Sequence, residues 1–439
     1  MKKGETKMKK ILVYSHDTFG LGNIRRMLAI VQKITESIED VSILVVSGSS
    51  MMQAFRLSPG IDYIKLPCLA RNATGAYAPK TLGISYRQLI NLRADLIVNA
   101  FLNFEPDMVL VDKKPLGVQN ELAPALEVLR RRANRPKLVL LLRDILDDTK
   151  KTAEIWQKND YHQIIAELYD RVLILGSRKV FDTVAEYEFP TSSRQKSHFC
   201  GYIAKQRPRR SVAQIRESLN SGSRKILLVT AGGGEDGQTI FHAALDAIER
   251  YQLNNTYSCL FFLGPEMQHT DRGSICNRIQ SIPNVMQKNF SGDFISYLEA
   301  ADMVVSMGGY NTLTELMAVN TPAVVIPRIE PCIEQWMRAK RFHQLGLIEV
   351  IHPRLLDPER LVKAIKRAES KLINPARYEF RRDLTGSTVV VEHVRMMLEE
   401  HFARGWTQID FSGYDRTRVD STLTVEDSYV DLPSIRHLQ

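Results

Sequence analysis

Short apolar runs alternate with amphipathic segments along most of this 439-residue chain. The runs are rich in Val, Ile and Leu, as expected for strands buried on both faces of a parallel sheet. The first half has such runs at 11–14, 42–46, 108–111, 138–142 and 171–175, and the second half at 225–230, 258–263, 285–290, 303–305 and 323–326. The segments between them, such as 23–38, 116–132 and 153–169, have the pattern of amphipathic helices. The alternation predicts an α/β protein with parallel sheets covered by helices on both faces.

The length of the chain predicts more than one domain, because a single core rarely grows to this size. A polar, proline-containing segment over residues 201–210 separates the two strand and helix series. We therefore predict two Rossmann-like doubly wound domains that face each other across a cleft, over residues 1–204 and 205–382. A further helix is expected over 383–404, where a return to the first domain is left open, and 405–439 is predicted to be a polar tail.

The composition is that of a soluble globular protein, with 44% hydrophobic and 25% charged residues. No run approaches the ~20 uninterrupted apolar residues that a membrane-spanning helix needs. The basic N-terminus leads into a strand rather than into the apolar core of a signal peptide. Five cysteines are scattered without a CxxC pair, which favours a reducing cytoplasm and neither zinc nor a disulfide framework.

Positive charge is concentrated in the first half of the chain, where residues 1–204 hold 30 Lys and Arg against 22 Asp and Glu. Such an excess suits an anionic acceptor, or peripheral contact with anionic lipid at the inner face of a membrane. An ordinary soluble surface is the alternative. Nucleic acid is not expected as a partner, because basic and aromatic residues are not interleaved as in RNA-binding motifs.

A glycine pair after the strand-like run 303–305 suggests a nucleotide site. Gly308 and Gly309 allow a tight turn and close approach of a ligand to the backbone. Asn311 is a suitable N-cap for a following helix, which would carry Glu315 in its first turn. The amides of such a helix N-terminus suit a phosphate, and a carboxylate beside them could accept both hydroxyls of a ribose. An ordinary turn between strand and helix is the alternative.

A second glycine loop, Gly232, Gly233 and Gly234, directly follows the strand-like run 225–230. Three residues without side chains let backbone amides face a phosphate. The same sequence would serve equally as a flexible turn between a strand and a helix.

From about residue 225 to 350 the chain resembles the donor domain of GT-B glycosyltransferases, most closely the MurG-like N-acetylglucosaminyltransferases of lipid-linked intermediates. The motif of that family is Ser-Gly-Ala-x-Thr-x-x-Glu followed by a Gly-x-Pro strand. The segment from Gly308 to Glu315 and the pair Thr321-Pro322 match it in spacing. The resemblance implies that Glu315 binds the ribose hydroxyls of a nucleotide diphosphate sugar. It also implies that Thr312 and the amides before it hold the diphosphate.

Further donor contacts are implied by the same resemblance. Gln335 matches one residue of a Gln pair that reaches the donor sugar, whereas Glu334 replaces the other. Phe290 and Ser291 fall where the family grips the base. Metal-dependent GT-A enzymes carry an Asp-x-Asp motif, which is absent from this sequence. No metal or cofactor is therefore expected, and the diphosphate charge would be met by amides, a helix dipole and Arg328 or Arg338.

The catalytic residues are less constrained by the sequence. His16 and Asp17 end the first strand, and Asp112 ends another, so each is a candidate general base. The glycine loop that follows the first strand, with Gly20, Gly22 and Asn23, matches the acceptor-side loop of the family. Asn23 stands where many relatives have a histidine. A third group at a strand end, Asp144, Asp147 and Asp148, is an alternative, and any of these carboxylates could simply cap a helix.

The sequence thus predicts a cytoplasmic, metal-independent and inverting glycosyltransferase. It would move a sugar, with N-acetylhexosamine suggested by the family, from a UDP-type donor to an acceptor that the sequence does not identify. A lipid-linked or otherwise anionic acceptor fits the basic first half. Two alternatives are a nucleotide-sugar 2-epimerase of the same fold and a catalytically silent homologue that acts as a partner protein.

Overall fold

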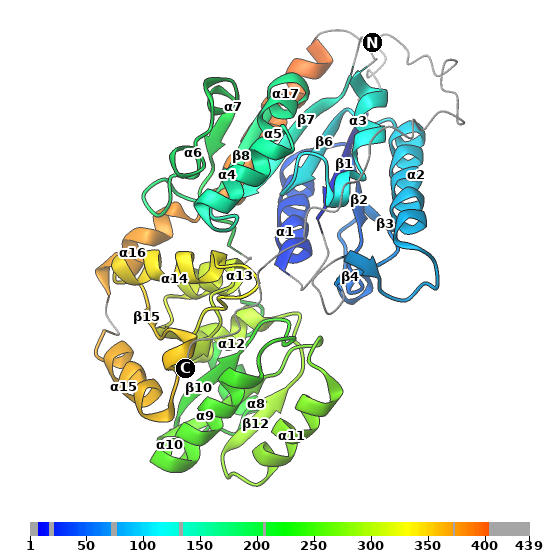
Figure 1. Cartoon of the computed structure of the whole chain (residues 1–439). Helices are drawn as coiled ribbons and strands as arrows, with labels where there is room; N and C mark the ends of the chain where they lie inside the picture. The colour runs from blue at the N-terminus through cyan, green and yellow to red at the C-terminus, as the bar shows by residue number, and fades with distance from the viewer. Residues whose placement is uncertain are drawn as a thin grey trace, which may run out of the picture.

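The computed structural model describes residues 8–16, 22–71, 77–130, 135–204, 208–371 and 374–403. The candidate residues Asp17 and Gly20 and the predicted tail lie outside the described residues. The described part of the chain forms two α/β bodies, one above the other in Figure 1, each built on its own parallel sheet. The predicted α/β class with two doubly wound sheets is confirmed.

The first body is built on a seven-stranded sheet with strand order β3-β2-β1-β6-β7-β8-β9, in which every neighbouring pair is parallel. Its strands are β1 (Lys9–Ser15), β2 (Val41–Ser47), β3 (Ile61–Lys65), β6 (Met108–Asp112), β7 (Lys137–Arg143), β8 (Arg171–Leu175) and β9 (Ser197–Phe199). A small antiparallel hairpin, β4 (Leu69–Arg71) with β5 (Tyr77–Pro79), lies beside it. The order reverses between β1 and β6, so a cleft is expected at the carboxyl ends of these two strands.

The second body repeats this arrangement with a six-stranded parallel sheet of order β12-β11-β10-β13-β14-β15. Its strands are β10 (Lys225–Thr230), β11 (Tyr257–Phe262), β12 (Val285–Lys288), β13 (Met303–Ser306), β14 (Ala323–Val325) and β15 (Glu349–Val350). Here the order reverses between β10 and β13. Each sheet therefore has one switch point. The strand at the switch point, β1 in the first sheet and β10 in the second, is followed in the sequence by a segment that contains glycines.

Helices cover both sheets. In the first body they are α1 (Gly22–Ser37), α2 (Tyr86–Phe104), α3 (Ala123–Arg130), α4 (Thr149–Lys158), α5 (Tyr161–Leu168), α6 (Thr183–Glu186) and α7 (Thr191–Gln195), with the 3-10 turns η1 (Met52–Ala54) and η2 (Val118–Asn120). In the second they are α8 (Val212–Ser218), α9 (Gln238–Tyr251), α10 (Leu253–Thr256), α11 (His269–Gln280), α12 (Phe294–Ala300), α13 (Tyr310–Val319), α14 (Glu334–Gln344), α15 (Pro358–Glu369) and α16 (Pro375–Phe380), with η3 (Pro353–Leu355) and η4 (Arg381–Asp383).

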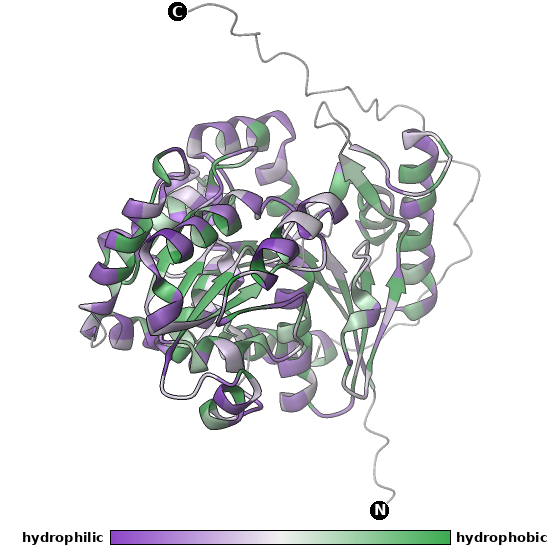
Figure 2. Ribbon diagram, turned by 90° about the horizontal axis from the view of Figure 1, so that it is seen from below, coloured by the Kyte–Doolittle hydropathy of each residue, from purple (hydrophilic) through white to green (hydrophobic). Residues whose placement is uncertain are grey.

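The cores follow from the strand sequences. The central strands β1, β6 and β7 bury nearly every side chain, because helices lie on both faces of the sheet. Hydropathy colouring in Figure 2 shows the same pattern, with apolar strands inside and helices that alternate between polar and apolar faces. Among the described residues, no helix is both long and apolar enough to cross a lipid bilayer.

The last helix, α17 (Gly386–Ala403), leaves the second body and packs along α1 and β7 of the first. Figure 1 shows it, in orange, beside the strands of the first body. The two chain crossings between the bodies are hydrogen-bonded to each other. The Tyr202 amide donates to the Asp383 carbonyl at 2.6 Å, and the Gly386 amide donates to the Tyr202 carbonyl at 3.0 Å.

The structure corrects several expected element boundaries. The segment expected as one helix from 116 begins only at Ala123, because Gly117 (φ 74°) and Gln119 (φ 50°) adopt left-handed backbone before it. The helix expected over 153–169 divides into α4 and α5 at Asp160, which also has positive φ. The edge strands β3, β9 and β15 were not predicted. They are short or only partly buried, so their sequences lack a continuous apolar run.

Candidate functional site

A cavity of about 600 Å³ lies between the two bodies, at the carboxyl ends of the strands that flank both switch points. Ligands of doubly wound proteins bind at this position because the loops diverge there. The cavity holds most of the residues that the sequence assigned to the donor and acceptor sides: Gly22, Asn23, Gly232, Gly233, Gly234, Phe290, Ser291, Gly309, Asn311, Thr312 and Gln335. Gly308 and Glu315 lie beside it, buried, without lining it directly.

The turn after β13 places a helix N-terminus at the cavity wall, but one residue assignment was wrong. Gly309 is the N-cap of α13, and Asn311 is already inside the helix. Glu315 consequently lies in the second turn, not the first. The Asn311 side chain does not cap its own helix but donates to the carbonyl of Gly22 at 2.9 Å, across to the first body. The first-turn amides of Tyr310, Asn311 and Thr312 therefore face the cavity without help from a capping side chain.

The glycine loop after β10 is shaped by its own packing. Gly234 has a φ of 93°, and a Cβ atom there would lie 2.0 Å from the carbonyl oxygen of Leu263. A side chain is thus excluded at Gly234 for reasons inside the protein. Gly232 also has positive φ, but a Cβ atom there would meet nothing within 4 Å, so its side toward the cavity is open. Nearby, burial and the charge of Glu235 raise the pKa of Glu266.

Phe290 offers an aromatic surface to the cavity. The residue is 36% exposed, and its ring meets Phe55 of the first body edge to face, with ring centroids 6.5 Å apart. Both rings are positioned by strand ends, β12 for Phe290 and the turn after β2 for Phe55. A flat apolar ring exposed in a polar cavity suits a planar ligand such as a nucleobase.

Gln335 contacts Arg328, and both residues line the cavity. The Gln335 side-chain oxygen accepts the amide of Arg328 at 3.2 Å. Arg328 lines the cavity and pairs with Asp236 of the glycine loop at 3.3 Å, with both side chains about a third or more exposed. Arg328 is therefore a cation that remains available to an anionic ligand.

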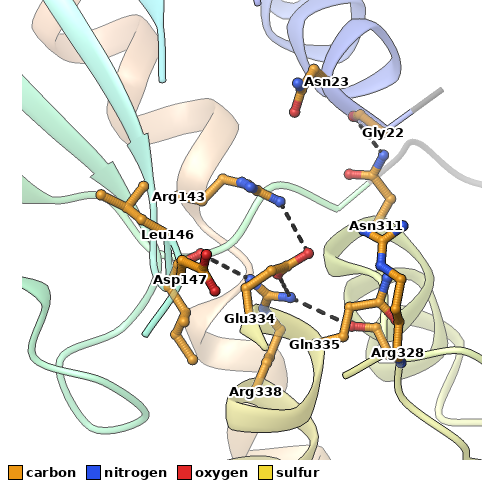
Figure 3. A network of polar contacts seen from close by, with 12 residues as sticks. Gly22, Asn23, Arg143, Leu146, Asp147, Asn311, Arg328, Glu334, Gln335 and Arg338 are labelled. Carbon is orange, nitrogen blue, oxygen red and sulfur yellow. Dashed lines mark hydrogen bonds and ion pairs between the residues drawn. The ribbon is translucent and has the colours of Figure 1, made fainter. Parts of the chain in front are cut away.

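Arg338, the other cation expected to neutralise a diphosphate, is not available. Its side chain is fully buried and pairs with Asp144 of the first body at 3.0 Å and with Glu334 at 2.6 Å. Glu334 in turn lies 3.5 Å from Arg143 of the first body, so one carboxylate bridges two arginines (Figure 3). Burial alone would raise the pKa of Glu334, but the charges of Arg338 and Arg143 outweigh it and bring the pKa to about 2.

Asp147 and Asp148, which follow β7 as Asp144 does, also make contacts that hold the fold. Asp147 accepts the amide of Ile333 across the domain interface at 2.9 Å. Asp148 caps α4 through the amide of Lys151. The alternative group of Asp144, Asp147 and Asp148 is therefore occupied by protein contacts, as the helix-capping alternative anticipated for one of the three.

The first body contributes a cationic wall that the sequence did not single out. Arg25, Arg26, Lys113 and Arg143 line the cavity. Lys113 follows β6 with a left-handed φ of 73°. Burial, with the charges of Arg143 and Lys114, lowers the pKa of Lys113 from 10.5 to about 8. In the sequence, Lys113 and Lys114 directly follow a predicted strand, which is where ligands bind in folds of this kind. A pair of lysines is also common on protein surfaces, so the sequence alone did not mark them as site residues.

The proposed bases His16 and Asp112 lie behind this wall. Both are 1% exposed and neither lines the cavity. Arg26 donates to one oxygen of Asp112 at 2.7 Å, and Nδ1 of His16 has no hydrogen-bond partner among the described residues. Burial, together with the charges of Lys113, Lys114 and Arg143, lowers the pKa of His16 well below 6.5, which keeps the imidazole neutral. Asn23, in the predicted acceptor loop, donates to the His16 carbonyl.

Metal ligands are not grouped in the described residues. No set of three or more His, Cys, Asp or Glu side chains in that part of the chain is arranged to hold an ion. The charges that face the cavity come from single arginine, lysine, aspartate and glutamate side chains.

Comparison with known proteins gives a family match to the second body. Residues 226–382 match the model of the glycosyltransferase family 28 C-terminal domain. The chain is 27% identical over 143 residues to an uncharacterized glycosyltransferase of Methanopyrus kandleri, over 33% of this chain and 38% of that protein. It is 26% identical over 203 residues to the UDP-N-acetylglucosamine–N-acetylmuramyl-(pentapeptide) pyrophosphoryl-undecaprenol N-acetylglucosamine transferase of Shouchella clausii, over 42% of this chain and 53% of that enzyme. The matches thus span about half the length of these relatives or less.

Solved structures match over most of the chain. The MurG structure of Acinetobacter baumannii superposes with a TM-score of 0.55 at 11% identity, over 88% of this chain and 99% of that one. A putative UDP-N-acetylglucosamine 2-epimerase of Listeria monocytogenes superposes with a TM-score of 0.59 at 13% identity, over 92% and 99%. At such identities the superpositions establish the fold and nothing about the reaction.

Proposed function

We propose that this chain, a MurG-like protein of GT-B fold with a glycosyltransferase family 28 C-terminal domain, transfers a sugar from a nucleotide diphosphate donor to an anionic acceptor. The family model over residues 226–382 and the two-domain fold confirm the predicted resemblance. The donor nucleotide, the acceptor and the residue roles that follow belong to the proposal. They rest on the residues that meet at the cavity between the two domains.

The observation that carries the proposal is the pairing of a helix N-terminus with a buried carboxylate. The open amides of the first turn of α13 suit a diphosphate, because the helix dipole adds positive potential there. Glu315, one turn further on, is 2% exposed and keeps one oxygen, Oε2, without a partner among the described residues. A buried carboxylate oxygen without a donor is costly, and ribose hydroxyls would satisfy it.

The remaining donor contacts follow from the walls of the cavity. The open side of Gly232 and the neighbouring glycines leave room for phosphate oxygens, and Arg328 supplies a cation. Phe290, followed by Ser291, offers its ring to the base, and Gln335 lies where the sugar would reach. The family resemblance favours uracil as the base and N-acetylhexosamine as the sugar.

The acceptor would enter against the first domain. Lys113 and Arg143 line that wall, so an acceptor with a phosphate or carboxylate near its reacting hydroxyl fits best, and a lipid-linked phosphate is one such molecule. His16 and Asp112 stay the candidates that the sequence offers for the general base, but both lie behind this wall, so we assign the role to neither. A lipid-linked acceptor would also bring the basic first domain to a membrane surface.

Thermal unfolding with UDP, dTDP, GDP and their sugars tests the donor assignment. We expect UDP ligands to raise the Tm of the wild type and to leave Glu315→Ala unchanged, because the ribose contact is lost. Glu379→Ala is the matched control, since Glu379 is an exposed carboxylate on α16 away from the cavity. An equal response of Glu315→Ala and the wild type would contradict the assignment.

Turnover separates the proposed transferase from the two alternatives. Conversion of UDP-N-acetylglucosamine to its 2-epimer without any acceptor would identify an epimerase. UDP binding without turnover across a panel of phosphorylated and lipid-linked acceptors would favour a silent partner protein.

A further inference from the structure

The carboxylate assigned to the donor ribose is already engaged by the opposite domain. Arg25, in the first turn of α1, places its guanidinium 2.6 Å from Oε1 of Glu315 on α13. The two residues are 290 positions apart in the sequence and come from different domains. The Glu315 side chain is 3% exposed, whereas that of Arg25 is 19% exposed and lines the cavity. The pair therefore lies at the boundary between the protein interior and the ligand space.

A second contact fixes the same two helices against each other. Asn311, four residues before Glu315 on the same face of α13, donates to the carbonyl of Gly22 at the start of α1. In Figure 3 this bond joins the starts of the two helices, and both residues line the cavity. Two contacts therefore join this face of α13 to the first turn of α1.

The hydrogen bonding of Glu315 is unequal between its two oxygens. Oε1 is bound by Arg25, while Oε2 is buried and has no donor in the described part of the chain. An ionised carboxylate has about four acceptor sites on its two oxygens, so it can accept one ribose hydroxyl on each oxygen. Ribose bound in this way meets the oxygen to which Arg25 already donates, and the two donors compete for it.

We propose that Arg25 and the donor ribose exchange on Glu315. Without donor, the Arg25 guanidinium neutralises the buried carboxylate; when the donor binds, its two ribose hydroxyls take both oxygens and Arg25 moves into the cavity. Donor binding then breaks an ion pair between the domains, so occupancy of the donor site is coupled to the position of α1. This inference rests on the proposed function, because it takes Glu315 as the ribose carboxylate.

Two nucleosides that lack phosphate test this exchange separately from any contact between Arg25 and a phosphate. Uridine and 2′,3′-dideoxyuridine differ only in the hydroxyls that would meet Glu315, and neither can form a new contact between Arg25 and a phosphate. Their affinities are measured by competition calorimetry against UDP for the wild type, Arg25→Ala, Arg25→Lys and the exposed control Arg87→Ala. Thermal unfolding of each variant checks that it is folded.

We expect Arg25→Ala to bind uridine about fivefold more tightly than the wild type, because no side chain has to leave Glu315. Binding of dideoxyuridine should stay the same, so the preference for the ribonucleoside rises by the same factor. Arg25→Lys should lie close to the wild type, and Arg87→Ala should equal it.

An unchanged preference in Arg25→Ala would overturn the exchange, since it would mean that Arg25 and ribose share the carboxylate or never meet on it. Failure of UDP to bind the wild type would overturn the proposed function, and the exchange with it. UDP binding with an unchanged preference would overturn the exchange alone.

Discussion

Two of the arginine–carboxylate pairs that cross the domain interface differ in their surroundings. Arg338 and Asp144 are both fully buried, and Arg338 donates to both oxygens of Asp144, to Glu334 and to the Ile145 carbonyl. Arg25 and Glu315 form one contact at the cavity edge, with a partly exposed guanidinium and an unpartnered carboxylate oxygen. Protein groups satisfy nearly all the hydrogen-bonding atoms of the Arg338–Asp144 pair, whereas Oε2 of Glu315 has no partner among the described residues.

This difference separates a contact that holds the domains together from one that a ligand can replace. A buried charge with several protein partners cannot leave them without a large desolvation cost. A charge that already borders the cavity can move into solvent or onto a ligand at little cost. The geometry therefore predicts that the domains stay joined through Arg338 while the contact at Glu315 opens.

The largest expected effect comes from removing one partner of the buried pair. Asp144→Ala should lower the free energy of unfolding by about 3–5 kcal/mol, because it leaves Arg338 charged and buried with too few acceptors. Arg25→Ala should lower it by less, about 1–3 kcal/mol, because it leaves the buried Glu315 carboxylate without its donor while the cavity beside it admits water. Urea denaturation followed by circular dichroism measures both changes under the same conditions.

A matched pair of variants tests whether the cost comes from the stranded charge. Combining Asp144→Leu and Arg338→Met with Glu334→Gln removes Arg338 together with both of its carboxylate partners and should regain much of the lost stability. Equal destabilisation by Asp144→Ala and Arg25→Ala would contradict the distinction between the two contacts.

The sequence predicts the strands and the site in outline but not these contacts across the interface. The predicted runs 11–14 and 225–230 lie within β1 and β10, because strands covered on both faces must be apolar throughout. The glycine loops were located from an equally local pattern, because glycines directly after a buried strand let the backbone approach a ligand, although an ordinary turn uses the same residues. In both cases the local sequence was enough to locate the strand or the loop.

The partners of Arg338 depend on long-range folding. Asp144 lies 194 residues away from Arg338 in the sequence, and no local pattern specifies that they meet. Glu334 looks like a lost sugar contact when compared with the family, yet in the structure it bridges Arg338 and Arg143. Asn311 was assigned as an N-cap because its residue type favours that position, but its side chain reaches the first domain instead.

Acid pH should weaken the buried cluster through Glu334. The folded protein lowers the pKa of Glu334 to about 2, from an ordinary value of 4.5. A lowered carboxylate pKa stabilises the fold fully above pH 4.5, and this contribution is lost as the pH falls from 4.5 toward about 2. The whole contribution is about 3 kcal/mol, at 1.36 kcal/mol for each pKa unit.

The matching measurement is the free energy of unfolding between about pH 5 and pH 3 for the wild type and Glu334→Gln. The wild type should lose more stability over this range than the variant, which has no carboxylate to protonate. Glu379→Gln, at an exposed position, serves as the control and should follow the wild type. Parallel curves for the wild type and Glu334→Gln would show that the cluster does not depend on this charge.

Ionic strength gives the smallest effect and compares the two pairs directly. Salt screens charges near the surface, with a Debye length of about 10 Å at 0.1 M and about 3 Å at 1 M, but has little effect on pairs that exclude solvent. Raising the salt concentration across this range should reduce the stability difference between the wild type and Arg25→Ala by a few tenths of a kcal/mol. The difference between the wild type and Asp144→Ala should stay constant within error, because Arg338 and Asp144 are both 0% exposed. If the Arg25 difference is as insensitive to salt as the Asp144 difference, then Arg25 is held as firmly as Arg338. A ribose could then displace it only at a cost close to that of breaking the buried pair.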